Sequence, residues 1–112
     1  MPLTATVEDA VSATFAALAD PGRRRVLDIV SAAPTSVTDL AEELEVSVPA
    51  ALKQVRALET ASLVRTRKVG RTRWCELSPR AGAEAEAWLS QRRAVWQRRL
   101  DRFEQHLKEK KK

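Results

Sequence analysis

The stretch from Val37 to Leu77 constrains the fold of this chain more than any other. Apolar residues first recur at helical spacing in two short segments, and then alternate with basic residues around Gly70. This order predicts two helices joined by a turn and followed by a two-stranded hairpin. We therefore predict a mainly α fold with a small β-hairpin.

Two further helices are expected before this stretch, over residues 8–18 and 21–32. Asp20 can cap the second helix, and Pro21 suits its first turn because no backbone donor is needed there. Pro34 ends the second helix, since proline cannot continue the hydrogen-bond ladder.

The helix-turn-helix is predicted over about residues 36–60. Ser36 can cap its first helix, and the second runs from Ser47 to Leu58 with Ala51, Val55 and Leu58 facing inward. The other face carries apolar and basic side chains that could enter the major groove of DNA. These candidate DNA-binding residues are Ser47, Val48, Pro49, Leu52, Lys53 and Arg56.

The hairpin is predicted over about residues 63–77, with Gly70 supplying the positive φ of a tight turn. Its strands alternate apolar with basic residues, which is typical of the wing of a winged helix-turn-helix protein. The candidate DNA-binding residues of the wing are Arg67, Lys68, Arg71 and Arg73.

Basic charge is concentrated in the middle of the chain. Residues 1–52 hold three basic and eight acidic side chains, whereas residues 53–80 hold eight basic and two acidic ones. Residues 81–112 add nine basic and five acidic side chains, which brings the total to +5. This local excess of positive charge favours attraction to phosphate at one surface. The other interpretation is that these side chains form a solvated face with no binding role.

A long amphipathic helix is predicted over about residues 80–108. Its apolar residues leave a stripe that one chain of this size has little means to cover, so we expect pairing with a second subunit. The second interpretation is that Trp88 and Trp96 form a small-molecule pocket between the two subunits. The predicted dimer-interface residues are Phe15, Trp88, Leu89, Val95, Trp96, Leu100 and Phe103.

The residues that commonly carry catalysis or bind metals are sparse. Cys75 is the only cysteine and His106 the only histidine, so one chain has neither an intrachain disulfide nor a zinc-ligand set. Alternation with Leu77 places Cys75 inward, as a structural rather than a redox residue. We expect no enzyme activity, no metal and no cofactor.

The 112 residues are enough for one domain, 1–112, and no run reaches the length of a membrane span. The acidic pair Glu8-Asp9 lies where a signal peptide needs basic residues. We expect a cytoplasmic protein that binds double-stranded DNA and no membrane.

Four segments, in order, resemble landmarks of the ArsR-type bacterial transcriptional regulators, in the branch without metal-binding cysteines. They are ALADPGRRRVLDIV, SVTDLAEELEVSVPAALKQVRALETASLV, RTRKVGRTRWCELSP and AWLSQRRAVWQRRLDRFEQHL. The resemblance implies a homodimeric repressor that binds an inverted repeat in a promoter. It identifies neither the operator nor an inducer.

The chain departs from that family at several positions. Leu52 stands where members often have Ser or Thr, and Gln54 where many have His. Glu45 and Ser62 follow helices where relatives commonly have Gly, so either they adopt a left-handed conformation or the turns differ. Residues 38–44, TDLAEEL, lack the cysteine pair of the family's metal sensors.

Two other functions are compatible with this sequence. A protein-interaction module could keep the fold and lose its operator, which a leucine at position 52 favours. An architectural protein could coat DNA without sequence preference, which the basic middle favours.

Overall fold

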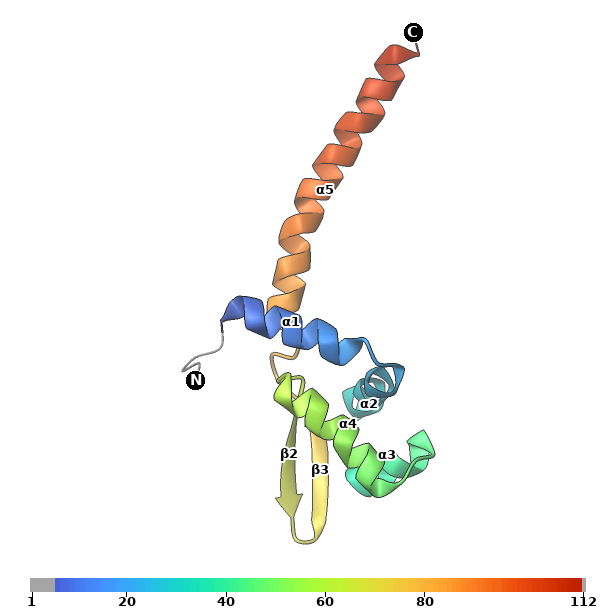
Figure 1. The fold of residues 1–112 in the computed structure, drawn as a ribbon, viewed down its shortest axis with the longest axis vertical. Coiled ribbons are helices and arrows are strands. Elements are labelled where there is room, and N and C mark those ends of the chain that lie inside the picture. Colours follow the sequence, from blue (N-terminus) through green and yellow to red (C-terminus); the bar gives the residue numbers. More distant parts are fainter. Residues whose placement is uncertain (1–5, 112) are drawn as a thin grey trace.

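The structure, a computed structural model, describes residues 6–111. Helices α1 to α4 and a small sheet form a body, from which α5 projects in the direction opposite to the hairpin (Figure 1). The predicted mainly α fold with a small hairpin is confirmed. The elements are α1 (Val7–Leu18), α2 (Pro21–Ala32), β1 (Thr35–Ser36), α3 (Val37–Leu44), α4 (Val48–Thr60), β2 (Val64–Val69), β3 (Thr72–Leu77) and α5 (Ala83–Lys110).

Side-chain caps start helices α2, α3 and α4 where the sequence predicts. The carboxylate of Asp20 accepts from the amide of Arg23 at 3.0 Å, so α2 begins at Pro21. Ser36 and Ser47 likewise accept from the amides three residues on, at 3.1 and 3.2 Å. Each bond satisfies an amide that has no partner within its own helix. The helix starts therefore follow from local chemistry.

The core lies between α2, α3, α4 and the sheet. Val26, Leu40, Val55 and Leu58 are fully buried in it. Helix α4, the second helix of the helix-turn-helix, packs against α1, α2, α3 and β2, and these contacts hold its inner face in place. The inward positions predicted for Ala51, Val55 and Leu58 are confirmed, because each is 0% exposed.

The sheet has three strands rather than the predicted two, in the order β1-β3-β2 with antiparallel pairing. Thr35 pairs with Cys75 and Ser36 with Trp74, which covers one edge of β3. A two-residue strand has too few positions to show an alternating pattern in sequence. The extra strand anchors the hairpin to the start of the helix-turn-helix.

Left-handed residues close both helices of the helix-turn-helix. Glu45 has φ 56° and Ser62 has φ 60°, which decides between the two options that the sequence leaves open. After each, the next amide donates to a carbonyl five residues back, Val46 to Ala41 and Leu63 to Leu58, both at 3.0 Å. These bonds offset the steric cost of a left-handed non-glycine residue, about 1–2 kcal/mol.

Helix α5 begins at Ala83, three residues later than predicted, and continues to Lys110. Gly82 precedes it at φ 74°, a left-handed conformation that turns the chain from the sheet into the helix. From residue 93 to residue 111 every residue is exposed. Among residues 6–111, no helix is both long and apolar enough to cross a bilayer.

Candidate nucleic-acid interface

The recognition helix presents a short exposed face. Val48 is 45% exposed, and Pro49, Lys53 and Arg56 are also exposed. Ser47 caps the helix and is itself exposed. The other exposed residues of α4 are Ala50 and Thr60, and the opposite face of the helix is buried. The sequence-predicted residues therefore lie together, with one exception.

That exception is Leu52, which was predicted to face DNA. It is half-buried and packs against the core beside residues such as Ala51 and Val55. Its position one residue after Ala51 in the helix turns part of its side chain toward the interior. Leu52 therefore supports the fold of α4. Because its side chain is partly used in this packing, it is not the fully exposed leucine that would favour a partner protein.

Gln54 fixes the recognition helix to the start of α2. Its amide donates to the Asp20 carboxylate at 3.2 Å. A Cβ at residue 22 would lie 2.8 Å from that amide nitrogen, so Gly22 leaves the space that the bond needs. Asp20 also accepts from the amide of Arg23, and this bond holds the pKa of Asp20 below its ordinary value.

The wing carries exposed cations around a two-residue turn, Gly70-Arg71, between the paired residues Val69 and Thr72. Gly70 has φ 62°, as the hairpin prediction requires. Arg71, like Arg67 and Lys68, is exposed. Their ammonium and guanidinium groups are therefore free to contact phosphate, which gives affinity without reading sequence.

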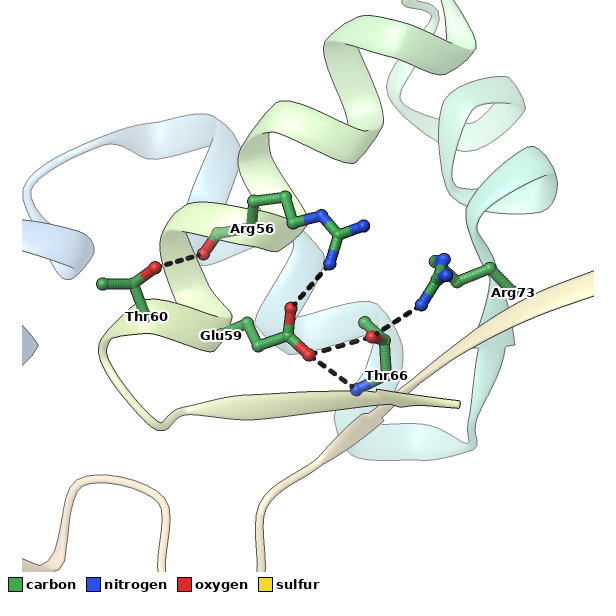
Figure 2. Close-up of polar contacts among 5 residues, drawn as sticks. All are labelled: Arg56, Glu59, Thr60, Thr66 and Arg73. Carbon is green, nitrogen blue, oxygen red and sulfur yellow. Dashed lines mark hydrogen bonds and ion pairs between the residues drawn. The ribbon is translucent and has the colours of Figure 1, made fainter. Parts of the chain in front are cut away.

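A polar network joins the recognition helix to the wing (Figure 2). The Glu59 carboxylate accepts from Arg56 at 3.2 Å through one oxygen. Its other oxygen accepts from the Thr66 hydroxyl at 2.9 Å and the Thr66 amide at 3.2 Å. Arg73 donates to the same hydroxyl at 3.1 Å and is half-buried. The bonds from Thr66, followed by those from Arg56, lower the pKa of Glu59, although partial burial opposes them.

The three consecutive arginines of α2 bond to main-chain carbonyls. Arg23 donates to the carbonyls of Ala17 and Ala16 at 2.7 and 3.0 Å, and Arg24 to that of Leu18 at 2.6 Å. Arg25 donates to the carbonyl of Glu43 at 2.9 Å, near the end of α3. Carbonyls in the last turn of a helix have no partner within it. The run therefore tethers helix ends, a role that sequence reasoning missed because it depends on tertiary contacts.

Cys75 is fully buried in the sheet, as predicted, whereas Leu77, two residues on in the same strand, is 40% exposed. Burial, with a smaller contribution from the negative charges of Glu59 and Glu76, raises the pKa of the Cys75 thiol to about 11. The thiolate, which is the reactive form, is thus disfavoured at neutral pH. Within the described part of the chain, no group of three or more His, Cys, Asp or Glu could hold a metal ion.

We expect Cys75 to react with a thiol reagent at pH 8 only when the protein is unfolded in urea. The measurement is the rate of labelling in buffer and in denaturant, with free cysteine as the control. Because the folded pKa lies above the ordinary value of 9.0, stability from the neutral thiol is present below pH 9 and is lost as the pH rises toward 11. Equal labelling rates in both conditions would contradict the buried assignment.

The predicted dimer-interface residues follow one side of α5 from the body outward. Near the body, Trp88 packs edge-on against Phe15 of α1, with ring centres 6.1 Å apart, and Arg92 lies 4.2 Å above the Trp88 ring. Farther out, Trp96 is 46% exposed and Phe103 60%. Apolar exposure of this kind continues through the remaining members, Leu89, Val95 and Leu100.

The sequence profile of a family described as a helix-turn-helix domain matches residues 18–67. The HTH-type transcriptional regulator Rv2034 of Mycobacterium tuberculosis is 35% identical over 89 residues, which are 80% of each protein. The crystal structure of the ArsR family transcriptional regulator RHA00566 is 34% identical, with a TM-score of 0.75 over 84% of this chain and 97% of that one.

The chain belongs to the ArsR family of transcriptional regulators. A transcriptional repressor SmtB homolog from Synechocystis is 39% identical over 64 residues, which are 57% of this chain and 48% of the relative. The match thus spans about half the length of that repressor. A homodimeric winged helix-turn-helix domain from Mycobacterium bovis, Mb0332, shares the fold at 21% identity and a TM-score of 0.62, over 87% of this chain and 91% of that one.

The winged helix of this ArsR-family protein is built on the expected positions. The recognition helix and the wing are adjacent, because α4 packs directly against β2. Within the described residues, the expected cations Lys53, Arg67, Lys68 and Arg71 make no ion pair and no side-chain hydrogen bond. Arg56 instead pairs with Glu59, and Arg73 donates to the hydroxyl of Thr66.

Proposed function

We propose that the protein is a homodimeric repressor that binds an inverted-repeat operator. Each subunit places the outer face of α4 in the major groove and the wing on the neighbouring backbone. The observation that carries this proposal is that α4 exposes Val48, Pro49 and Lys53 and packs against β2 of a wing whose turn carries exposed cations. The name of the repressor homolog supports repression over activation.

Dimerisation is proposed through α5 and α1. Trp96, Leu100, Phe103 and Leu107 recur at steps of four, three and four, so they lie on one side of the helix. This side is continuous with an open apolar groove at the base of α5. Residues that line the groove include Phe15, Leu18, Leu27, Leu77 and Leu89. A second copy that covers both surfaces removes a large apolar area from water.

The proposal is tested by selecting duplexes from a random pool with the purified protein and footprinting the duplexes that are enriched. The expected result is a protected palindrome whose half-site centres lie about 34–36 Å apart, one helical turn. Protection that extends continuously along the duplex would indicate an architectural protein. Failure to enrich or protect any duplex would indicate a protein-interaction module.

Substitutions should separate the contacts to bases from those to phosphates. Arg71→Ala is expected to weaken binding to operator and random duplex alike, and to lower the salt dependence by about one counterion per subunit. Lys53→Ala is expected to cost more on the operator, about 1–3 kcal/mol. Gel shifts at several salt concentrations measure both effects.

Arg98→Ala is the matched control, because it removes the same charge from the exposed outer part of α5. It should change operator affinity less than about twofold, since phosphate contact requires proximity. Identical losses for the Arg71, Lys53 and Arg98 variants would contradict both the wing and the recognition-helix assignments.

A further inference from the structure

Glu59 is a negative charge in the middle of the most basic part of the chain. Residues 53–80 contain eight basic side chains and two acidic ones, Glu59 and Glu76. A carboxylate repels phosphate at any distance within the screening length, about 8–10 Å. Glu59 therefore weakens the general attraction of this surface to DNA, and its contacts indicate what it contributes instead.

The two acidic residues have different surroundings. Glu76 pairs with Arg65 at 2.8 Å, and the two residues are register partners on adjacent strands, so this ion pair stays within the sheet. Glu59 belongs to the last turn of α4 and bonds across to Thr66 of β2. Glu59 thus links separate elements, whereas Glu76 does not.

The contacts of Glu59 reach both proposed DNA-binding elements (Figure 2). Arg56, on the recognition helix, donates to one carboxylate oxygen at 3.2 Å. The Thr66 hydroxyl donates to the other oxygen and accepts from Arg73 of the second wing strand. Thr66 has one hydroxyl proton, so its bond to Glu59 leaves an oxygen lone pair for Arg73. One carboxylate therefore orients an arginine on each side.

A fixed geometry between helix and wing matters for recognition. A wing that moves freely against α4 must be ordered on binding, and this ordering costs free energy. A misplaced Arg56 also gains phosphate contacts on any duplex without gaining base contacts on the right one. When the wing and Arg56 are both held in place, the affinity for random duplexes falls more than the affinity for the duplex that fits this geometry.

We propose that Glu59 is a specificity-determining positioning residue, which sets the wing relative to the recognition helix through Thr66 and orients Arg56 directly. The inference rests on the proposed function, because it concerns the same DNA-binding surface. The quantity that it controls is the ratio of operator affinity to random-duplex affinity. Removal of the Glu59 carboxylate should lower this ratio. It should also raise the total affinity for DNA, because the loss of a negative charge strengthens the attraction to phosphate.

The test compares Glu59→Ala with Glu76→Ala, since both variants lose one negative charge and one ion pair with arginine. Both should bind random duplex about two- to fivefold more tightly at low salt. Only Glu59→Ala should lower the operator-to-random ratio, by about tenfold, the effect of losing hydrogen bonds to a charged group. Gel shifts with the selected operator and a scrambled duplex give both numbers.

A second variant, Thr66→Val, removes the bridging hydroxyl without changing the charge. It should lower the ratio about threefold, with an unchanged slope of log affinity against log salt. Helix content and melting temperature are measured for every variant, and only folded fractions are titrated. A loss of stability alone lowers operator and random binding together, so it does not move the ratio.

Equal ratios for the Glu59 and Glu76 variants, or an unchanged ratio for Thr66→Val, would overturn the positioning role. Such results do not contradict the proposed function if the wild-type protein binds its operator more tightly than random duplex. If the wild-type protein itself binds both duplexes equally, the proposed function fails, and with it the basis of this inference.

Discussion

Replacing both Trp96 and Phe103 by glutamate is expected to convert the protein into a monomer and to weaken operator binding at least about 100-fold. The loss is large because a dimer places two recognition helices on one operator, and linked binding exceeds either single contact by about 10²–10⁴. Two carboxylates in an apolar interface cannot be buried without partners. Sedimentation gives the oligomeric state, and gel shifts give the affinity.

The body of the subunit should survive this change. Both residues lie in the outer part of α5, where residues 93–111 are all exposed and contribute nothing to the core. The double variant Gln91→Glu with Gln105→Glu is the matched control, because it adds the same charge on the other side of the helix. The control should stay dimeric. A Trp96/Phe103 variant that remains a dimer at micromolar concentration would exclude this side of α5 as the interface.

Leu58→Ala is expected to lower the free energy of unfolding by about 2–5 kcal/mol, the cost of a cavity in place of a buried leucine. Leu58 is 0% exposed and lies where α4 meets the core. Small domains are stable by only about 5–15 kcal/mol, so the variant loses a large share of its stability. Urea unfolding at one fixed protein concentration measures the change, because the proposed dimerisation would make stability depend on concentration.

Val69→Ala is the control for this experiment, since Val69 near the wing turn is 57% exposed. It should change the free energy of unfolding by less than about 0.5 kcal/mol. Leu52→Ala should fall between the two, because Leu52 is half-buried against the core. If Leu58→Ala costs no more than Val69→Ala, the described packing of the recognition helix is wrong.

Local chemistry made the main elements predictable. Ser36 and Ser47 mark helix starts because their hydroxyls accept from amides three residues on, a contact within one turn of chain. The inward face of α4 follows from spacing alone, and the positive φ of Gly70 from the tight turn. The positions of most candidate DNA-binding residues along α4 and the wing therefore follow from local sequence patterns.

Other features depend on contacts that no local pattern encodes. Leu52 was placed on the DNA-facing side by its position along α4, yet its side chain reaches the core. The arginines at 23–25 bond to carbonyls of other helices, which no pattern along the chain indicates. In each case the helical position was predicted, but the neighbour across the fold was not.

By itself, the sequence determined the order of the helices and the hairpin, the caps of α2, α3 and α4, the basic charge around the wing and the apolar stripe of α5. These properties arise from residues within a few positions of one another, where the backbone geometry is fixed. Only the tertiary structure decided that β1 extends the sheet and that Glu59 joins the recognition helix to the wing through Thr66. Such contacts form when packing brings separate elements within hydrogen-bond distance, about 3 Å.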